Sequence, residues 1–114
     1  MTPDTSFPKA LRLLRSSDFR RVQRRGRRVR TSHLLVIYLR GRRNTPRFGL
    51  TVSRKVGNAV TRNRVKRWLR EALRHHKAEL HGAWDVVFIP NPKAPFVGFE
   101  VIEAEVTEAL RRIR

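Results

Sequence analysis

A row of cations between residues 62 and 74 is the part of the sequence whose residue types and spacing best suit chemistry. Arg62, Lys66, Arg70 and Arg74 recur at four-residue steps. With about 3.6 residues per turn, this spacing aligns the side chains along one surface of a helix. Like charges at this spacing repel each other, whereas the planar arginine fork gives phosphate two parallel charge-assisted hydrogen bonds. The row therefore predicts contact with a phosphate-rich anion.

The helix that must carry this row is marked at both ends. Gly57 and Asn58 predict a turn and an N-cap, and Gly82 predicts the end of the helical segment. The row is expected to lie opposite an apolar stripe, and a phosphate at the N-terminal end would offset the repulsion between nearby arginines and the helix dipole. The stripe consists of apolar residues with helical spacing: Val60, Val65, Trp68, Leu69, Ala72, Leu73 and Leu80.

The charge of the whole chain supports the same kind of partner. The chain has 114 residues and a net charge of +18, from 27 basic and nine acidic residues. Residues 1–74 contain 22 of the basic residues and three of the acidic ones, whereas residues 75–114 contain five and six. A bound polyanion would relieve the self-repulsion of such a chain. We expect the polyanion to meet the first 74 residues.

Length and composition predict a single domain over residues 1–114. Hydrophobic residues make up 39% of the chain, which suffices for a modest core. The absence of cysteine excludes disulfides and thiolate metal sites. The sequence shows neither the pattern of a signal peptide nor an apolar run of transmembrane length. We therefore expect a cytoplasmic protein with no membrane partner.

The remaining segments predict an α+β fold, a two-layer sandwich in which helices pack on a small sheet. The expected elements follow from hydrophobic periodicity and from turn residues. In order, they are an extended lead-in (1–8), a helix ended by Gly26, a short strand (27–32), two adjacent antiparallel strands (33–41 and 47–55), the central helix, a buried strand (83–90) and a final helix (99–113).

Outside the row, the sequence offers no set of residues suited to protein-borne catalysis or metal binding. His75 and His76 are adjacent, so they point in different directions on a helix and make a poor chelating pair. No nucleophile-base pair or Gly-rich phosphate loop is present. We predict no catalytic residue and no metal ligand. The acids of the final helix have the spacing of an exposed amphipathic surface: Glu100, Glu103, Glu105 and Glu108.

The central segment resembles a known family. The stretch "VGNAVTRNRVKRWLREALR" is similar to the RNR signature of the bacterial ribonuclease P protein subunit, and "GLTVSRK" before it resembles the strand that leads into that signature. The resemblance extends to "KALRLLRSSDFRRVQRRG", to "WDVVFIP" and to the final helix that begins with Phe99. It implies a mixed sheet with a left-handed βαβ crossover around the RNR helix, whereas handedness statistics alone favour a right-handed one.

The resemblance also implies a function. In that family a catalytic RNA removes the 5′ leader of precursor tRNA with magnesium ions that the RNA mainly binds, and the protein contacts both RNAs. The implied partners are ribonuclease P RNA and precursor tRNA, with no stable protein partner. The implied contacts to the catalytic RNA are Arg54, Lys55, Arg62, Asn63, Arg64, Lys66, Arg67, Arg70 and Arg74. The implied contacts to the leader are Lys9, Arg12, Phe19, Gln23 and Ile37.

Some features leave alternatives open. Positions 23 and 37 often carry aromatic residues in the family, but here they are Gln23 and Ile37. Phe19 fits either a core position or a ring on which a base stacks. A basic ribosomal structural protein would share the charge and the size. A DNA-binding repressor is a further rival, but a strand rather than a helix is expected before the central helix.

Overall fold

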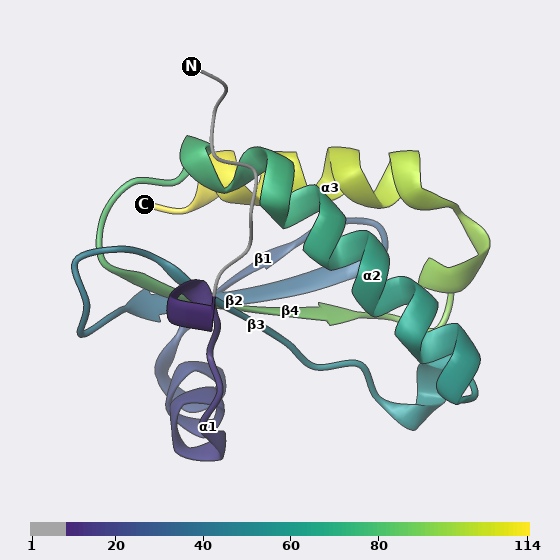
Figure 1. Cartoon of the computed structure of the whole chain (residues 1–114), viewed down its shortest axis with the longest axis horizontal. Coiled ribbons are helices and arrows are strands. Elements are labelled where there is room, and N and C mark those ends of the chain that lie inside the picture. The colour runs from purple at the N-terminus through teal and green to yellow at the C-terminus, as the bar shows by residue number, and fades with distance from the viewer. Residues whose placement is uncertain (1–8) are drawn as a thin grey trace.

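Four strands form one mixed sheet in the order β1-β2-β4-β3. The computed structural model describes residues 9–114, so the lead-in expected over residues 1–8 lies outside the described part of the chain. Figure 1 shows how the elements are arranged. The strands are β1 (Arg27–Arg30), β2 (Leu34–Arg40), β3 (Arg47–Leu50) and β4 (Trp84–Pro90), and the helices are α1 (Ser16–Arg25), α2 (Ala59–His76) and α3 (Phe99–Arg112).

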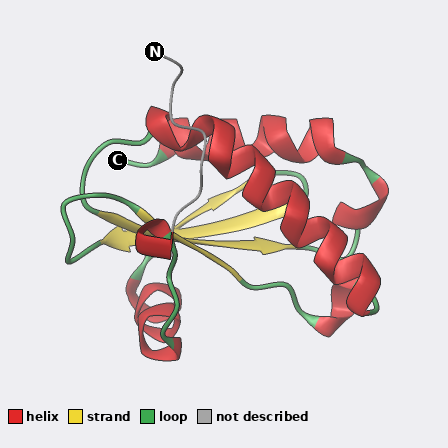
Figure 2. Ribbon diagram, viewed as in Figure 1, coloured by secondary structure: helices red, strands yellow, loops and turns green. Residues whose placement is uncertain are grey.

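The two faces of the sheet are covered by different helices. Figure 2 shows α1 on one side of the strands and α2 with α3 on the other. Val36 and Phe88 belong to the larger buried cluster, which they share with α2 and α3, whereas Ile37 and Val87 pack with Val22 of α1. The expected packing of helices on a small mixed sheet is confirmed, and α1 adds a helix on the second face.

The expected pairing of the second and third strands is wrong. β2 pairs with β4 in the antiparallel sense, and β3 pairs with β4 in the parallel sense, so β4 lies between them. The physical reason is the composition of β4, which is apolar at nearly every position and is largely buried. Such a strand is stabilised at the centre of a sheet, where its backbone groups are paired on both sides. The short strand expected over residues 27–32 is confirmed, because β1 pairs with β2.

The parallel pair β3 and β4 is joined through α2, which forms a βαβ unit. The predicted N-cap of α2 is confirmed, because Oδ1 of Asn58 accepts a hydrogen bond of 2.9 Å from the backbone N–H of Thr61. Gly57 has a φ of 153°, and a Cβ atom there would lie 2.8 Å from the side chain of Thr61. The helix ends at His76, earlier than expected, and a short 3-10 turn (Lys77–Glu79) continues toward Gly82.

No helix within residues 9–114 combines the length and the apolar run required to cross a bilayer.

Candidate nucleic-acid interface

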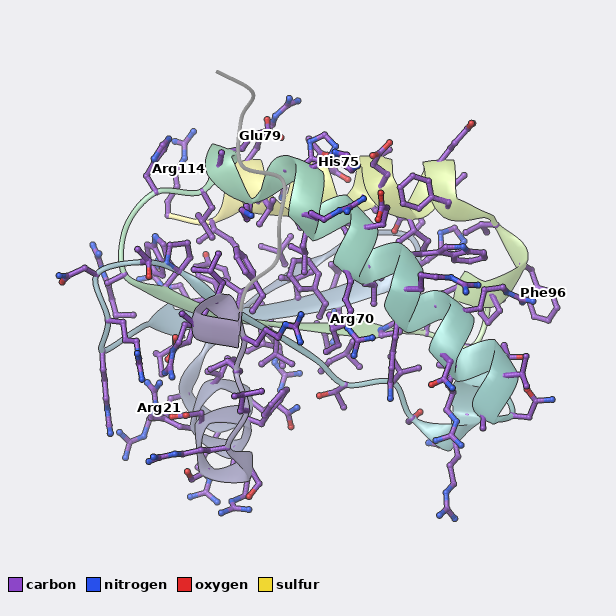
Figure 3. All side chains as sticks on the ribbon, viewed as in Figure 1. Arg21, Arg70, His75, Glu79, Phe96 and Arg114 are labelled. Atoms are coloured by element: carbon purple, nitrogen blue, oxygen red, sulfur yellow. The ribbon has the colours of Figure 1, made fainter. Side chains whose placement is uncertain are left out.

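The predicted row of α2 does not lie wholly opposite the apolar stripe, which corrects the expectation from the sequence. Val65, Leu69, Ala72 and Leu73 are buried and fix the inner side of α2. The predicted row begins beside this stripe and winds outward, because each four-residue step turns by about 40° more than one full turn. Arg62 and Lys66 are half-buried, whereas Arg70 is exposed. Figure 3 shows the side chain of Arg70 projecting from α2. Asn63 and Arg67, one step round from the row, are also exposed.

Most of these cations have no acidic partner. Within the described residues, five of the six Lys and Arg residues of α2 make no ion pair: Arg62, Arg64, Lys66, Arg67 and Arg70. Glu71 is the acid of α2, and its Oε1 atom accepts hydrogen bonds from Arg74 and His75. Hydrogen bonds from Arg74 and then from His75 hold the pKa of Glu71 below its ordinary value. The outer surface of α2 thus carries uncompensated positive charge, which an anion would neutralise.

Arg64 lies on the other flank of α2 and already has partners in the protein. Its guanidinium carbon is 5.5 Å from the centroid of the Trp68 ring, within the range of a cation-π contact. Its Nη2 atom donates a hydrogen bond of 3.4 Å to the backbone oxygen of Pro95, in the 3-10 turn Ala94–Phe96. The structure therefore separates Arg64 from the exposed Arg67, although the sequence placed both in one RNA-binding set.

Two further cations extend the surface toward the sheet. Arg54 and Lys55 belong to a short 3-10 turn (Arg54–Val56) between β3 and α2, and both are exposed. Val56 of the same turn is buried, which anchors the turn to the core. The predicted contacts to the catalytic RNA therefore all lie in α2 and in the turn before it, with Arg64 on a different flank from Arg67.

The predicted leader-binding residues divide between an accessible set and a buried one. Phe19 and Gln23 are half-buried on α1, and Nε2 of Gln23 donates a hydrogen bond of 3.3 Å to Oγ1 of Thr51. The ring of Phe19 packs on β3, since a Cβ atom at Gly49 would lie 2.5 Å from it. The core alternative for Phe19 applies in part, because its ring joins the smaller core cluster and keeps an exposed portion, and base stacking stays a prediction.

Ile37 does not fit the prediction of direct leader contact. Its side chain is 2% exposed and lies in the core cluster beneath α1. The reason is its position on the central pair of strands, on the face that α1 covers. Arg12 is exposed and its backbone bridges to Phe48 at the edge of β3. Lys9 begins a short 3-10 turn (Lys9–Leu11), and its side chain lies outside what the structure describes.

A buried ion cluster, which the sequence prediction missed, fixes α1 to the sheet. Asp85 of β4 is 1% exposed. It accepts hydrogen bonds of 3.0 and 2.9 Å from Nε and Nη2 of Arg47 in β3, and another from Arg21 of α1. Figure 3 marks Arg21 on α1. Hydrogen bonding to Asp85, opposed by burial, raises the pKa of Arg47 above its ordinary value. The sequence signal that could have indicated this cluster was an acid, Asp85, inside the apolar run "WDVVFIP".

A second buried acid corrects another expectation. Glu105, expected on the exposed surface of α3, is 8% exposed. Its carboxylate accepts a hydrogen bond of 2.7 Å from the backbone N–H of His33 and another from Oγ1 of Thr31, and it lies 2.6 Å from Nδ1 of His33. Burial alone would raise the pKa of Glu105, but these hydrogen bonds outweigh it and the pKa is lowered. The partners lie more than 70 residues away in sequence, so helical spacing could not show them.

The histidine contacts do not form a catalytic arrangement among the described residues. Thr31 donates to the carboxylate of Glu105 rather than to the imidazole of His33, so these three residues do not form a chain in which histidine links a hydroxyl to a carboxylate. His75 and His76 contact different acids, Glu71 and Glu79. Within residues 9–114 no three His, Asp or Glu side chains converge to hold a metal ion.

A small α+β domain that presents uncompensated cations on one helix, and holds Arg21 and Arg47 on a buried acid, has the features of a polyanion-binding protein. The family model described as Ribonuclease P matches residues 7–114. The chain therefore belongs to the ribonuclease P protein family, as the RNR resemblance indicated.

Curated relatives and solved structures agree with this assignment. A "Ribonuclease P protein component" from Desulforapulum autotrophicum is 34% identical over 108 residues, which are 95% of this chain and 92% of the relative. Another, from Desulfovibrio desulfuricans, is 42% identical over 94% of this chain and 85% of the relative. The RNase P protein from Thermotoga maritima has a TM-score of 0.83 and 30% identity, covering 90% of this chain and 97% of that one. The RNase P protein from Staphylococcus aureus has a TM-score of 0.80 and 31% identity, covering 90% of this chain and 93% of that one.

Proposed function

We propose that this chain is the protein subunit of a ribonuclease P ribonucleoprotein. In this proposal it binds the catalytic RNA and the 5′ leader of precursor tRNA, and it assists the magnesium-dependent removal of the leader that yields the mature tRNA 5′ end. The single observation that carries the proposal is the family match over residues 7–114. The uncompensated cations on α2 support it independently, because they suit an RNA backbone.

The outer surface of α2 is the proposed contact to the catalytic RNA. Arg67 and Arg70 are exposed, and Arg54 with Lys55 extends the surface before the helix begins. Arginine forks and lysine ammonium groups neutralise phosphates and release condensed counterions, so binding should weaken steeply with salt. Asn63 is exposed between these cations and adds an uncharged donor and acceptor.

The edge between α1 and β3 is the proposed contact to the leader. The exposed portion of Phe19 offers a surface on which an unpaired base can stack, a contact that contributes on the order of 1 to 3 kcal/mol. Gln23 lies one turn further along α1 and presents an amide beside Thr51. Arg12 supplies a charge for the leader backbone. Lys9 is proposed as a leader contact because of the family resemblance. Ile37 is buried, so its proposed role is to pack beneath α1 rather than to contact the leader.

Magnesium is assigned to the RNA in this proposal. The acids nearest the proposed surfaces are already engaged, Glu71 with Arg74 and Asp18 with Arg21 and Arg47. Such acids have little capacity for a hard divalent cation, which prefers several free oxygen ligands. The chain's own contribution is to bind and orient both RNAs.

The test is cleavage of precursor tRNA by a bacterial ribonuclease P RNA at low magnesium, with and without the purified protein. We expect the protein to raise the rate, and replacement of Arg62, Arg64 and Arg67 by alanine to remove most of the gain. The matched control replaces Arg24, Arg25 and Arg28, three exposed arginines outside the proposed surfaces, and should retain the gain. A ribosomal structural protein would bind RNA but leave cleavage unchanged, and that outcome would reject the proposal.

A further inference from the structure

A cavity outside α2 has five arginines among its eight lining residues. It lies where the short turn Lys9–Leu11 and the first turn of α1 meet the loop between β2 and β3, and its volume is about 620 Å³. Figure 1 shows this loop on the same side of the molecule as that turn. The polar lining is formed by five arginines and one acid: Arg12, Arg15, Arg42, Arg43, Arg47 and Asp18.

The acid does not neutralise the cavity. Asp18 lies 3.6 Å from Nη1 of Arg47 and 4.0 Å from Nη2 of Arg21, so it faces the arginines that hold Asp85. Among residues 9–114, Arg15, Arg42 and Arg43 make neither an ion pair nor a hydrogen bond through their side chains. Three exposed guanidinium groups gathered at one cavity repel one another. An anion placed among them would remove that repulsion.

The cavity contains one arginine held in place by hydrogen bonds and two exposed arginines on a loop. Arg47 is held by two hydrogen bonds to the buried Asp85, which leaves its position little freedom. The loop that carries Arg42 and Arg43 starts at Gly41, whose backbone N–H donates a hydrogen bond of 2.6 Å to Ala83. A Cβ atom at Gly41 would lie 2.8 Å from Oδ1 of Asp85, so the loop begins tightly against the ion cluster. Arg42 and Arg43, beyond it, are exposed.

We propose that this cavity is a binding site for consecutive phosphate groups. Arginine favours phosphate because its planar fork donates two parallel hydrogen bonds, and the three guanidinium groups of Arg15, Arg42 and Arg43 can donate to more than one phosphate. The volume lies in the range of cavities that hold ligands of nucleotide size. No lining residue belongs to α2, so the site is distinct from the proposed contact to the catalytic RNA.

The phosphates can come from a free oligophosphate or from an RNA backbone. Both present closely spaced phosphoryl groups, and the cavity recognises that shared chemistry. Arg12 also belongs to the proposed leader-binding residues, which makes the leader one candidate source of the phosphates. The site itself does not require the function proposed above, because a free oligophosphate would bind without any RNA.

The first test measures binding of tripolyphosphate to the full chain by titration calorimetry. We expect Arg42→Gln combined with Arg43→Gln to weaken binding at least about tenfold, since charge-assisted hydrogen bonds are removed. Arg24→Gln combined with Arg25→Gln is the matched control, with the same change in net charge at two exposed adjacent arginines of α1 outside the cavity. The control should change affinity less than about threefold. Equal losses in both variants, or no measurable binding to the parent chain, would overturn the proposal.

A further variant keeps the proposal testable if the double variant does not fold. Arg15→Gln changes a different element of the cavity, and we expect it to weaken tripolyphosphate binding while the melting temperature without ligand stays at the parent value. Arg15 flanks α1 without a side-chain capping bond, so its replacement removes no interaction that defines the helix. An unchanged affinity in this variant would count against the site.

The second test distinguishes the two sources of phosphate. Binding of precursor tRNA by the complex with ribonuclease P RNA is measured over a range of salt for the parent and the Arg42, Arg43 variant. If the leader backbone enters the cavity, the salt slope falls by about 0.7 for each phosphate that the variant no longer neutralises. A slope that stays the same, together with weakened tripolyphosphate binding, assigns the site to a free oligophosphate. A failure of precursor-tRNA cleavage would reject the proposed function without affecting the calorimetric result.

Discussion

The arginines of α2 and the arginines around Asp85 show how one residue type performs two tasks in one small domain. Arg67 and Arg70 are exposed and have no acidic partner among the described residues, so their charge is available to a ligand. Arg47 is 9% exposed and donates two hydrogen bonds to Asp85, which also binds Arg21. Arg47 and Arg21 are thus held by a carboxylate within the fold, whereas Arg67 and Arg70 leave their charge exposed.

This division also bears on how a chain with so high a positive charge forms a compact domain. The net charge of +18 would disfavour a compact domain if every cation were left unpaired. The structure places two acids, Asp85 and Glu105, at buried positions where each organises polar groups from separate elements. The acids thus stabilise the scaffold from inside, and the unpaired cations remain on the surface.

The largest effect is expected from removing the acid of the buried cluster. Asp85→Ala leaves Arg47 as a buried charge without its main partner, and breaking a buried pair in this way costs about 3 to 5 kcal/mol of unfolding free energy. Urea denaturation measures the loss. The control is Glu108→Ala, an exposed acid of α3 that lies 3.9 Å from Arg112 and should matter by less than about 1 kcal/mol.

If Asp85→Ala fails to fold, Asp85→Asn keeps the shape of the side chain and should still be less stable than the parent chain. If the Asp85 variants lose no more unfolding free energy than Glu108→Ala, the ion cluster does not hold α1. The contrast between arginines that stabilise the fold and exposed arginines on α2 would then be wrong.

A smaller effect is expected at the second buried acid. Glu105→Gln removes the charge that accepts hydrogen bonds from Thr31 and His33, and hydrogen bonds to charged groups contribute about 1.5 to 3 kcal/mol. The pKa of Glu105 is lowered in the folded state, so its ionised form stabilises the fold above the unfolded pKa of about 4.3. This contribution is lost as the pH falls through the lower folded pKa.

Urea denaturation across pH therefore tests the role of Glu105. The parent chain should exceed the Glu105→Gln variant in stability at neutral pH, and the difference should shrink below pH of about 4.3. A difference that is constant with pH would mean that the charge of Glu105 does not contribute. The exposed Glu108 provides a control, since its exposed pair with Arg112 contributes little and Glu108→Gln should change the stability by less than about 1 kcal/mol at every pH.

Local signals in the sequence were sufficient for the start of α2, for its buried side and for the exposure of Arg67 and Arg70, although α2 ends earlier than expected. Gly57 and Asn58 determine where α2 begins through contacts within a few residues, and the spacing of its apolar residues fixes which side is buried. The exposure of Arg67 and Arg70 follows from the same periodicity. These features depend on neighbours in sequence, which is why they could be predicted without any tertiary contact.

Contacts between distant segments were not predictable in the same way. β4 enters between β2 and β3 because its apolar residues require a central position, whereas the short connection between β2 and β3 favoured a hairpin. The burial of Glu105 depends on His33, and the burial of Ile37 depends on α1. Helical or strand periodicity indicates which side of an element is buried, but it does not identify the residues against which that side packs.

A prediction at α1 sharpens the comparison between a clamped scaffold and an exposed surface. Phe19→Ala removes a ring that packs on Gly49 and keeps an exposed portion. If a leader base stacks on it, binding of precursor tRNA by the complex with ribonuclease P RNA should weaken by about 1 to 3 kcal/mol, and binding of mature tRNA should change less. Equal losses for both RNAs would assign Phe19 to the core alone, and Phe19→Leu is the control that keeps most of the packing.

The smallest effect is expected from comparing two arginines of α2. Arg67→Ala should lower the slope of log affinity for ribonuclease P RNA against log salt by about 0.7 to 0.9, because one phosphate is no longer neutralised by the protein. Arg64→Ala should lower it less, since its guanidinium donates to Pro95 and lies against Trp68. Filter binding at several salt concentrations measures both slopes, and Arg111→Ala on α3 provides the baseline. An equal decrease for both would show that Arg64 leaves Pro95 to reach the RNA, so that a partner within the protein does not by itself remove an arginine from the binding surface.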